Sequence, residues 1–254
     1  MLRGNAGNLL FSDDAGHTWS DPEPIPPLSG GLKTYTDLAL NGLVEGDTVT
    51  FIFFTRVGDT KRDVSFIRRY NVGSRTWSDP QFFPRTWNSN EGSITRAKNG
   101  NLVAAFRFVM PGIPQPSDHW CGQFTTISKD DGKTWSEPSV HLKYGHVHQS
   151  LLPFPDGRTL MTYASRIGEL EGRNYHGIEA VMSYDHGETW DWARRYILFR
   201  WSSGYMHGPQ SVLLSDGRIL TSFMYHTDFP WANDDPDQGP IRFMGHVSVV
   251  IWSP

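Results

Sequence analysis

The chain has a single cysteine, Cys121, among its 254 residues, so it can form neither an internal disulfide nor a zinc site built from several thiolates. It also has no long apolar stretch: the longest, residues 49–54, contains Thr50 and falls far short of the roughly 20 residues of a membrane helix. The formal net charge is -4, with 23 lysines and arginines against 27 aspartates and glutamates spread along the sequence. Without a basic stripe to neutralise a phosphate backbone, we expect no nucleic-acid partner and no membrane span.

What the sequence does contain fits one globular domain over residues 1–254. Hydrophobic residues make up 38% and charged residues 20%, a composition typical of a soluble chain with a large core. Aromatic residues, glycines and prolines are frequent, with 10 Trp, 15 Phe, 25 Gly and 17 Pro. This combination favours many short strands, many turns and aromatic packing between them.

An eight-residue pattern, S-x-D-x-G-x-T-W, occurs three times, at residues 12–19, 128–135 and 183–190. A shortened copy ends at Trp77, so tryptophans at 19, 77, 135 and 190 are separated by 58, 58 and 55 residues. The aspartate of such a pattern can accept backbone N–H bonds in a tight turn, while the glycine takes a positive φ and the tryptophan packs against a neighbouring layer. We therefore interpret the pattern as structural and not catalytic.

A second repeated signal is an X-Gly dipeptide between two apolar runs, which predicts a β-hairpin. The four copies are Glu45-Gly46, Asn99-Gly100, Asp156-Gly157 and Asp216-Gly217. Each unit of about 57 residues then reads strand, X-Gly turn, strand, loop, strand, S-x-D-x-G-x-T-W turn, strand. Four antiparallel strands at a fixed interval predict an all-β protein, a β-propeller of four-stranded blades. A β-sandwich, the main alternative, gives no reason for evenly spaced tryptophans.

With these repeats, the sequence resembles the sialidase superfamily, in which the S-x-D-x-G-x-T-W turn is called the Asp-box or BNR repeat. The resemblance covers essentially the whole chain and implies a six-bladed propeller. The length corresponds to about four to five units, and residues 8–11 and 246–252 both fit the third strand of a blade. We expect an incomplete propeller, truncated at both ends, with a genuinely small ring as the alternative. Residues 228–240 fit a loop inserted in the last unit.

Equivalent positions of the units indicate a common site. Counting back nine residues from the X-Gly glycines reaches the start of each first strand, at Asp37, Glu91, His148 and Gly208. The second strands end at the same face, with Arg56, Arg107 and Arg166 in three successive units. Guanidinium groups bind carboxylates bidentately, so this arrangement favours a site for an anionic sugar. Alternatively, each arginine pairs with a neighbouring carboxylate and joins two blades.

The sialidase resemblance implies roles for some of these residues. The family pattern of glutamate, strand, D/N-G turn, strand and arginine is matched from Glu91 through Asn99-Gly100 to Arg107. By this resemblance, Glu91 assists a nucleophilic tyrosine, and Arg107 belongs to a triad that binds the substrate carboxylate. Another triad arginine precedes the turn of the following blade, where Arg173 and Arg166 are the candidates.

The sequence departs from the family pattern at the nucleophile. The resemblance places a tyrosine at the start of the first strand one blade beyond Glu91, and that position is Gly208. Tyr205, three residues earlier, can fill the role only if the strand entry is shifted; Tyr225 ends the next strand of the same unit. The family's general acid belongs nearer the start of the propeller, and Asp37 is its substitute here.

Histidines cluster at the same positions. His146 and His148 lie on one side of a strand, and His207 falls near the equivalent point of the next unit. Hydrogen bonding to sugar hydroxyls or proton transfer fits them better than zinc binding, which needs a third firm ligand. Asp234, Asp235 and Asp237 lack the spacing of a calcium loop. We expect no metal and no cofactor.

We therefore expect a glycoside hydrolase that removes a terminal anionic sugar, such as a sialic acid, from a glycan. One alternative is another exo-glycosidase on the same fold, with Glu91 and Asp37 as a carboxylate pair whose separation sets retention or inversion. The other alternative is a propeller that binds glycans without catalysis. The family is commonly exported, so we expect an extracellular or periplasmic protein, although no signal peptide is visible.

Overall fold

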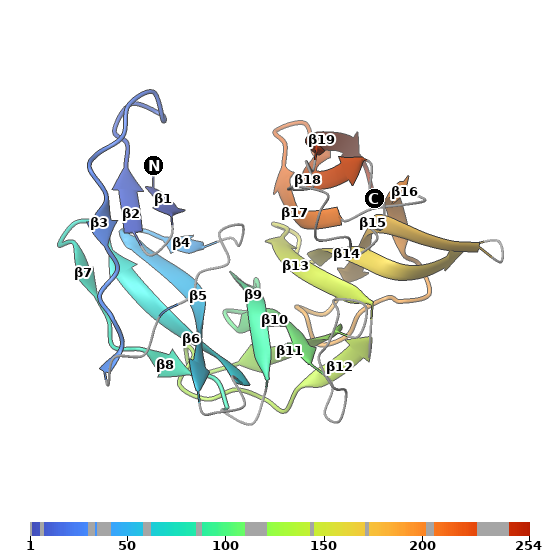
Figure 1. Ribbon diagram of the computed structural model, residues 1–254. Helices are drawn as coiled ribbons and strands as arrows, with labels where there is room; N and C mark the ends of the chain where they lie inside the picture. The colour runs from blue at the N-terminus through green and yellow to red at the C-terminus, as the bar shows by residue number, and fades with distance from the viewer. Residues whose placement is uncertain are drawn as a thin grey trace, which may run out of the picture.

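The computed structural model describes residues 2–5, 8–29, 34, 42–57, 62–84, 88–109, 121–142, 145–170, 173–201, 206–227 and 244–254. Its strands form five antiparallel sheets that follow one another in chain order around an arc (Figure 1). The predicted all-β propeller architecture is confirmed. Within the described residues, no helix has the length and apolarity needed to cross a membrane.

The sheets contain three or four strands in sequence order, and the second has one extra short strand. The first comprises β1 (Leu2–Asn5), β2 (Asn8–Phe11) and β3 (Glu23–Pro24). The second comprises β4 (Leu43–Glu45), β5 (Thr48–Val57), β6 (Arg62–Asn71) and β7 (Thr76–Trp77), with β8 (Gln81–Phe82) also paired to β6. The third comprises β9 (Ser89–Arg96), β10 (Leu102–Val109), β11 (Cys121–Ser128) and β12 (Ser139–Leu142). The fourth comprises β13 (His146–Pro153), β14 (Thr159–Leu170), β15 (Arg173–Ser183) and β16 (Tyr196–Trp201). The fifth comprises β17 (Met206–Leu213), β18 (Ile219–Thr227) and β19 (Met244–Trp252).

Both kinds of predicted turn lie where the repeat places them. The X-Gly turns join the first two strands of the second to fifth sheets, and their glycines all have positive φ, from 58° to 103°. The S-x-D-x-G-x-T-W turns join β2 to β3, β11 to β12 and β15 to β16. Because the strands are antiparallel, both kinds of turn share one end of the sheets, which we call the turn end. The first strands begin at the opposite end.

Hydrogen bonds explain why the S-x-D-x-G-x-T-W turn needs its aspartate. In the turn after β11, Asp130 accepts bonds from the Thr134 N–H at 2.8 Å and the Thr134 hydroxyl at 2.6 Å. Ser128 Oγ donates to Asp130 at 2.9 Å and accepts from the Gly132 N–H at 2.7 Å. The turns at 12–19 and 183–190 repeat these bonds. Bonds from Thr134 lower the pKa of Asp130 to about 2.

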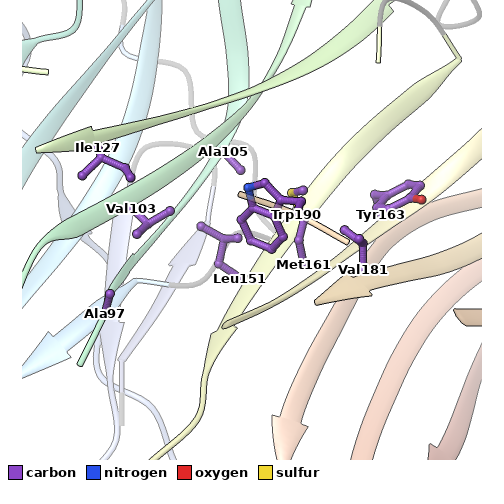
Figure 2. Close-up of a cluster of buried hydrophobic side chains, with 9 residues drawn as sticks. All are labelled: Ala97, Val103, Ala105, Ile127, Leu151, Met161, Tyr163, Val181 and Trp190. Carbon is purple, nitrogen blue, oxygen red and sulfur yellow. The ribbon is translucent and has the colours of Figure 1, made fainter. Parts of the chain in front are cut away.

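The core lies between successive sheets. Four of the five buried apolar clusters draw their residues from two neighbouring sheets, and the fifth, around Val147, joins the third, fourth and fifth sheets. Figure 2 shows the cluster between the third and fourth sheets, where Trp190 of the turn after β15 packs with Val103 of β10 and Leu151 of β13. The predicted role of the repeated tryptophan as an apolar anchor is confirmed there.

The turn glycine allows the next sheet to come close. A Cβ added to Gly187, in the turn after β15, would lie 2.8 Å from both methyl carbons of Val103 in the preceding sheet. A Cβ added to Gly132, in the turn after β11 of the third sheet, would lie 2.7 Å from Ile67 Cδ1 in the second sheet. Both glycines also have positive φ, at 89° and 85°. The glycine therefore satisfies a backbone requirement and a packing requirement together.

Replacing Gly187 by alanine should destabilise the protein more than replacing Gly100, although their φ values are 89° and 90°. Each variant carries the cost of a Cβ at positive φ, about 1–2 kcal/mol. Only Gly187→Ala adds a methyl group against Val103, where overpacking costs about 1–3 kcal/mol more, whereas no atom lies within 4 Å at Gly100. Urea denaturation measures both losses. Equal losses would show that the turn does not press on the preceding sheet.

Acid should weaken the turn after β11 through Asp130. Its pKa falls from 3.8 to about 2 on folding, so its contribution is complete well above pH 3.8 and disappears as the pH falls through about 2. The Asp130→Asn variant keeps an oxygen acceptor but does not titrate. Between about pH 5 and pH 2, its urea midpoint should therefore fall less than that of the parent. Identical pH profiles would contradict this role of the carboxylate.

Candidate functional site

A β-bulge recurs in three sheets, near the beginning of the first strand. In each, two residues of the first strand face one residue of the second. The bulged pairs are Glu91-Gly92 in β9, His148-Gln149 in β13 and Gly208-Pro209 in β17. The first residue of each pair has positive φ, at 47°, 58° and 51° respectively. These are the positions reached by counting back nine residues from the turn glycines, and we call this end of the sheets the bulge end.

The bulge raises the conformational free energy of the backbone at two of its three occurrences. Glycine accepts positive φ without penalty, as Gly208 does, whereas Glu91 and His148 each carry a cost of about 1–2 kcal/mol. Backbone strain of this kind concentrates at functional sites, where the surrounding structure holds it in place. The two strained residues also face each other across neighbouring sheets, which makes them the centre of the candidate site.

Four charged or titratable side chains meet there, which we call the Glu91 cluster. Arg107 Nη1 of β10 donates to Glu91 Oε1. His148 Nδ1 of β13 lies 3.3 Å from Glu91 Oε2, and Arg166 Nη2 of β14 lies 3.4 Å from His148 Nε2. The order is thus arginine, glutamate, histidine, arginine, across two sheets. The side chains of Arg107, Glu91 and His148 are 14%, 10% and 16% exposed, so the cluster is largely shielded but still reaches solvent.

A second group, which the sequence did not predict, adjoins this cluster. Arg56 Nε at the end of β5 lies 3.0 Å from Asp63 Oδ1 of β6. The other oxygen, Asp63 Oδ2, accepts a bond of 2.6 Å from Asn90 Nδ2, next to Glu91 in β9. One signal was available in the sequence: in an antiparallel hairpin, Asp63 falls directly opposite Arg56. The pairing matches the alternative in which each arginine pairs with a neighbouring carboxylate, but within one sheet and not between two blades.

The other predicted site residues are placed only in part. Asp37 and Tyr205 lie outside the described residues. Arg173 pairs with Leu170 at the start of β15, and His207 lies in β17 opposite Met224, with the backbone alone described for both. The structure therefore brings together Glu91, Arg107, His148 and Arg166 and places Arg56 on Asp63.

Tyr163, opposite the bulge of β13, belongs to a buried group of its own. Its hydroxyl donates to Glu179 Oε2 at 2.7 Å, and Arg195 Nη1 lies 3.2 Å from the same oxygen. Burial raises the pKa of Tyr163 well above 10. The ring of His146 packs edge-on at 5.1 Å between centroids. These contacts give Tyr163 and His146 a structural role between the sheets.

No group of three or more histidine, cysteine, aspartate or glutamate side chains that could hold a metal ion is present in the part of the chain that the structure describes. The Glu91 cluster itself supplies three kinds of chemical group. These are a carboxylate, an imidazole within proton-transfer range of it, and two guanidinium groups that match anionic ligands.

Comparisons with known proteins agree on the fold. The family described as BNR repeat-like domain matches residues 2–174. Similar solved structures include a Dyadobacter fermentans protein of unknown function, with a TM-score of 0.63 and 19% identity over 100% of this chain and 67% of that one. They also include the NanB sialidase of Streptococcus pneumoniae, with a TM-score of 0.58 and 16% identity over 97% of this chain and 35% of that one. A Penicillium chrysogenum α-L-arabinanase has a TM-score of 0.56 and 13% identity over 81% of this chain and 60% of that one. No curated protein matches the chain.

These relationships bear on architecture and not on activity. Identities of 13–19% show a shared fold alone. The chain spans 35% of the sialidase and 60% of the arabinanase.

Replacing His148 by glycine should leave a more stable protein than replacing it by alanine. Both variants lose the imidazole, but only glycine accepts φ of 58° without a cost of about 1–2 kcal/mol. Ser150, two residues further along β13 and in regular pairing with Thr162, provides the control. At Ser150, the alanine variant should have a free energy of unfolding about 0.5–1 kcal/mol above that of the glycine variant. Urea denaturation of the four variants checks this reversal, and the same order at both positions would rule out a constraint from the bulge.

Proposed function

The chain belongs to the BNR repeat-like domain family, and on that basis we propose that it hydrolyses a terminal, negatively charged sugar of a glycan at the Glu91 cluster. One observation carries the proposal. Arg107, Glu91, His148 and Arg166 form a continuous line at the bulge end, and Glu91 and His148 hold strained backbone conformations. Asp131, which pairs with two arginines at the turn end, also has positive φ, at 61°, but its side chain is 57% exposed, so strain and shielding from solvent occur together at Glu91 and not at Asp131.

The two arginines favour an anionic sugar. Arg107 and Arg166 stand at the two ends of the cluster, and planar guanidinium groups bind carboxylates with two parallel hydrogen bonds. The similar folds of a sialidase and an arabinanase support a glycan substrate in general. The arginines of this chain are the feature that favours a sugar acid over a neutral sugar.

Glu91 is the carboxylate at the reacting centre. Glycoside hydrolysis passes through a transition state with positive charge on the sugar ring, which a carboxylate stabilises. His148, 3.3 Å from Glu91, is placed to exchange a proton with it or to bond a sugar hydroxyl.

The sialidase resemblance adds a nucleophilic tyrosine, and we assign Tyr205, three residues before Gly208, to that role. A neutral phenol approaches a substrate carboxylate without charge repulsion. Tyr163 does not suit the role, because it is buried and bonded to Glu179.

A second candidate function is glycan binding without catalysis. The observation that favours it is Gly208, which has no side chain at the third bulge, where the resemblance calls for the nucleophile. In that case the Glu91 cluster recognises a sugar acid and releases it unchanged.

The Glu91→Gln substitution should lower kcat/KM for the hydrolysed sugar at least ~100-fold, because it removes the charge that the transition state requires. The assay is a panel of fluorogenic sialosides, uronides and neutral glycosides with the full-length protein. Glu45→Gln provides a matched control, since Glu45 is also bonded to an arginine, Arg96, but at the turn end. It should leave kcat/KM within about twofold, a change that corresponds to less than ~0.5 kcal/mol.

The same panel separates the two candidate functions. Turnover by the parent, lost in Glu91→Gln and in Tyr205→Phe, supports the hydrolase. Binding of a sugar acid by a parent that turns over no substrate supports the non-catalytic function. Full activity of Glu91→Gln would remove Glu91 from the mechanism.

A further inference from the structure

The strand segment that leads into the first bulge is bonded to the preceding sheet at three successive residues. The Asp63 N–H donates to Asn88 Oδ1 at 3.0 Å, and the Ser65 hydroxyl donates to the Ser89 carbonyl at 2.7 Å. Asn90 Nδ2 then donates to Asp63 Oδ2 at 2.6 Å. Asp63 and Ser65 both belong to β6, so this entry segment is aligned by one strand of the neighbouring sheet.

The residues that follow Glu91 are held as well. Gly92 packs so tightly that an added Cβ would lie 2.7 Å from Phe106 Cδ1. Ser93 Oγ accepts a bond of 3.1 Å from the Leu151 N–H of β13, in the following sheet. The backbone is therefore fixed to different sheets on the two sides of Glu91.

This double attachment explains how Glu91 keeps a φ of 47°. A non-glycine residue gains about 1–2 kcal/mol by leaving the left-handed region, so a loosened segment would relax toward ordinary strand geometry. The side chain would then turn away from Arg107 and His148, because a change at a bulge re-aims the residue that it carries. The geometry of the cluster thus depends on bonds made by residues outside it.

We propose that Asp63 is a positioning residue for Glu91 and acts through Asn90. Three bonds converge on Asp63, which is 8% exposed: its N–H holds Asn88, Oδ2 holds Asn90, and Oδ1 receives Arg56. Arg56 orients Asp63 through this bond. The inference rests on the proposed function, in which Glu91 is the reacting carboxylate.

The first experiment measures steady-state kinetics on the substrate found with the fluorogenic panel. Asp63→Ala should lower kcat about 10–100-fold with KM within about twofold, because a displacement near 1 Å is enough for such a loss. Asp63→Asn should recover most of kcat, since its amide can donate to Asn90 Oδ1 once the Asn90 amide is reversed. If Asp63→Ala does not fold, Asn90→Ala removes the same bond from the other partner.

The matched control is Asp216→Ala. Like Asp63, Asp216 accepts a bond from an arginine side chain, from Arg218 Nε at 2.8 Å, and it accepts another from the Arg218 N–H at 3.0 Å. Asp216 lies in the turn between β17 and β18, away from the bulge end. Its kcat should equal that of the parent. An unchanged kcat in Asp63→Ala would overturn the proposal. So would an Asp63→Asn variant as inactive as Asp63→Ala, because the carboxylate charge itself would then be needed, as for a second catalytic acid.

The second experiment needs no substrate. Glu91→Gly should have a folding equilibrium constant about tenfold above that of Glu91→Ala, since both lack the carboxylate and glycine alone avoids the strain. In an Asp63→Asn, Asn90→Ala background the bond from Asn90 is lost while those of Asn88, Ser89 and Ser93 remain, and the ratio should fall clearly below its value in the parent background. An unchanged ratio would overturn the positioning role even if the parent hydrolyses nothing. Failure of the proposed function and failure of this inference are therefore distinguishable.

Discussion

The close approach of the S-x-D-x-G-x-T-W turns after β11 and β15 to the sheets before them sets the distance between those sheets. Gly132 lies against Ile67 and Gly187 against Val103, where an added Cβ would not fit. Sheets held this closely bury an apolar cluster between them, β9 and β13 lie in contact, and His148 Nδ1 lies 3.3 Å from Glu91 Oε2. The candidate site at the bulge end thus depends on turns that contribute no side chain to it.

The β-bulge near the beginning of the first strand has different consequences in the three sheets that contain it. At Gly208 the positive φ of the bulge costs nothing, while Glu91 and His148 hold it at a loss of stability. The neighbouring sheets compensate for that loss at Glu91, through the bonds of Asp63, Ser65 and Leu151 to residues on either side. Strain at this position is therefore compatible with a stable fold, and it keeps a carboxylate in a conformation that an ordinary strand would not hold.

Ion pairs between arginines and carboxylates occur at both ends of the sheets but in different settings. At the turn end, Arg96 joins Glu45 and Asp131, and Arg69 joins the same Asp131, whose φ is also positive, at 61°, but whose side chain is 57% exposed. Such pairs connect neighbouring sheets and contribute little individually. Among the residues that the structure describes, only the pair of Arg107 and Glu91 combines shielding from solvent with a strained carboxylate and an adjacent imidazole. An arginine at an equivalent position of each unit, or one paired with a carboxylate, is thus not enough to identify a functional site.

The sequence by itself determined the repeat, the strand order, both kinds of turn and the equivalence of positions nine residues before the turn glycines, three of which the structure shows to be bulges. These features follow from local turn chemistry and alternation, which are written in consecutive residues. Only the tertiary structure decided that Arg107 meets Glu91 whereas Arg56 meets Asp63, and that Asn90 links the two groups. These pairings depend on the distance between sheets and on the bulge geometry. The arginines stand 10, 7 and 9 residues after their turn glycines, so no fixed spacing reveals their partners.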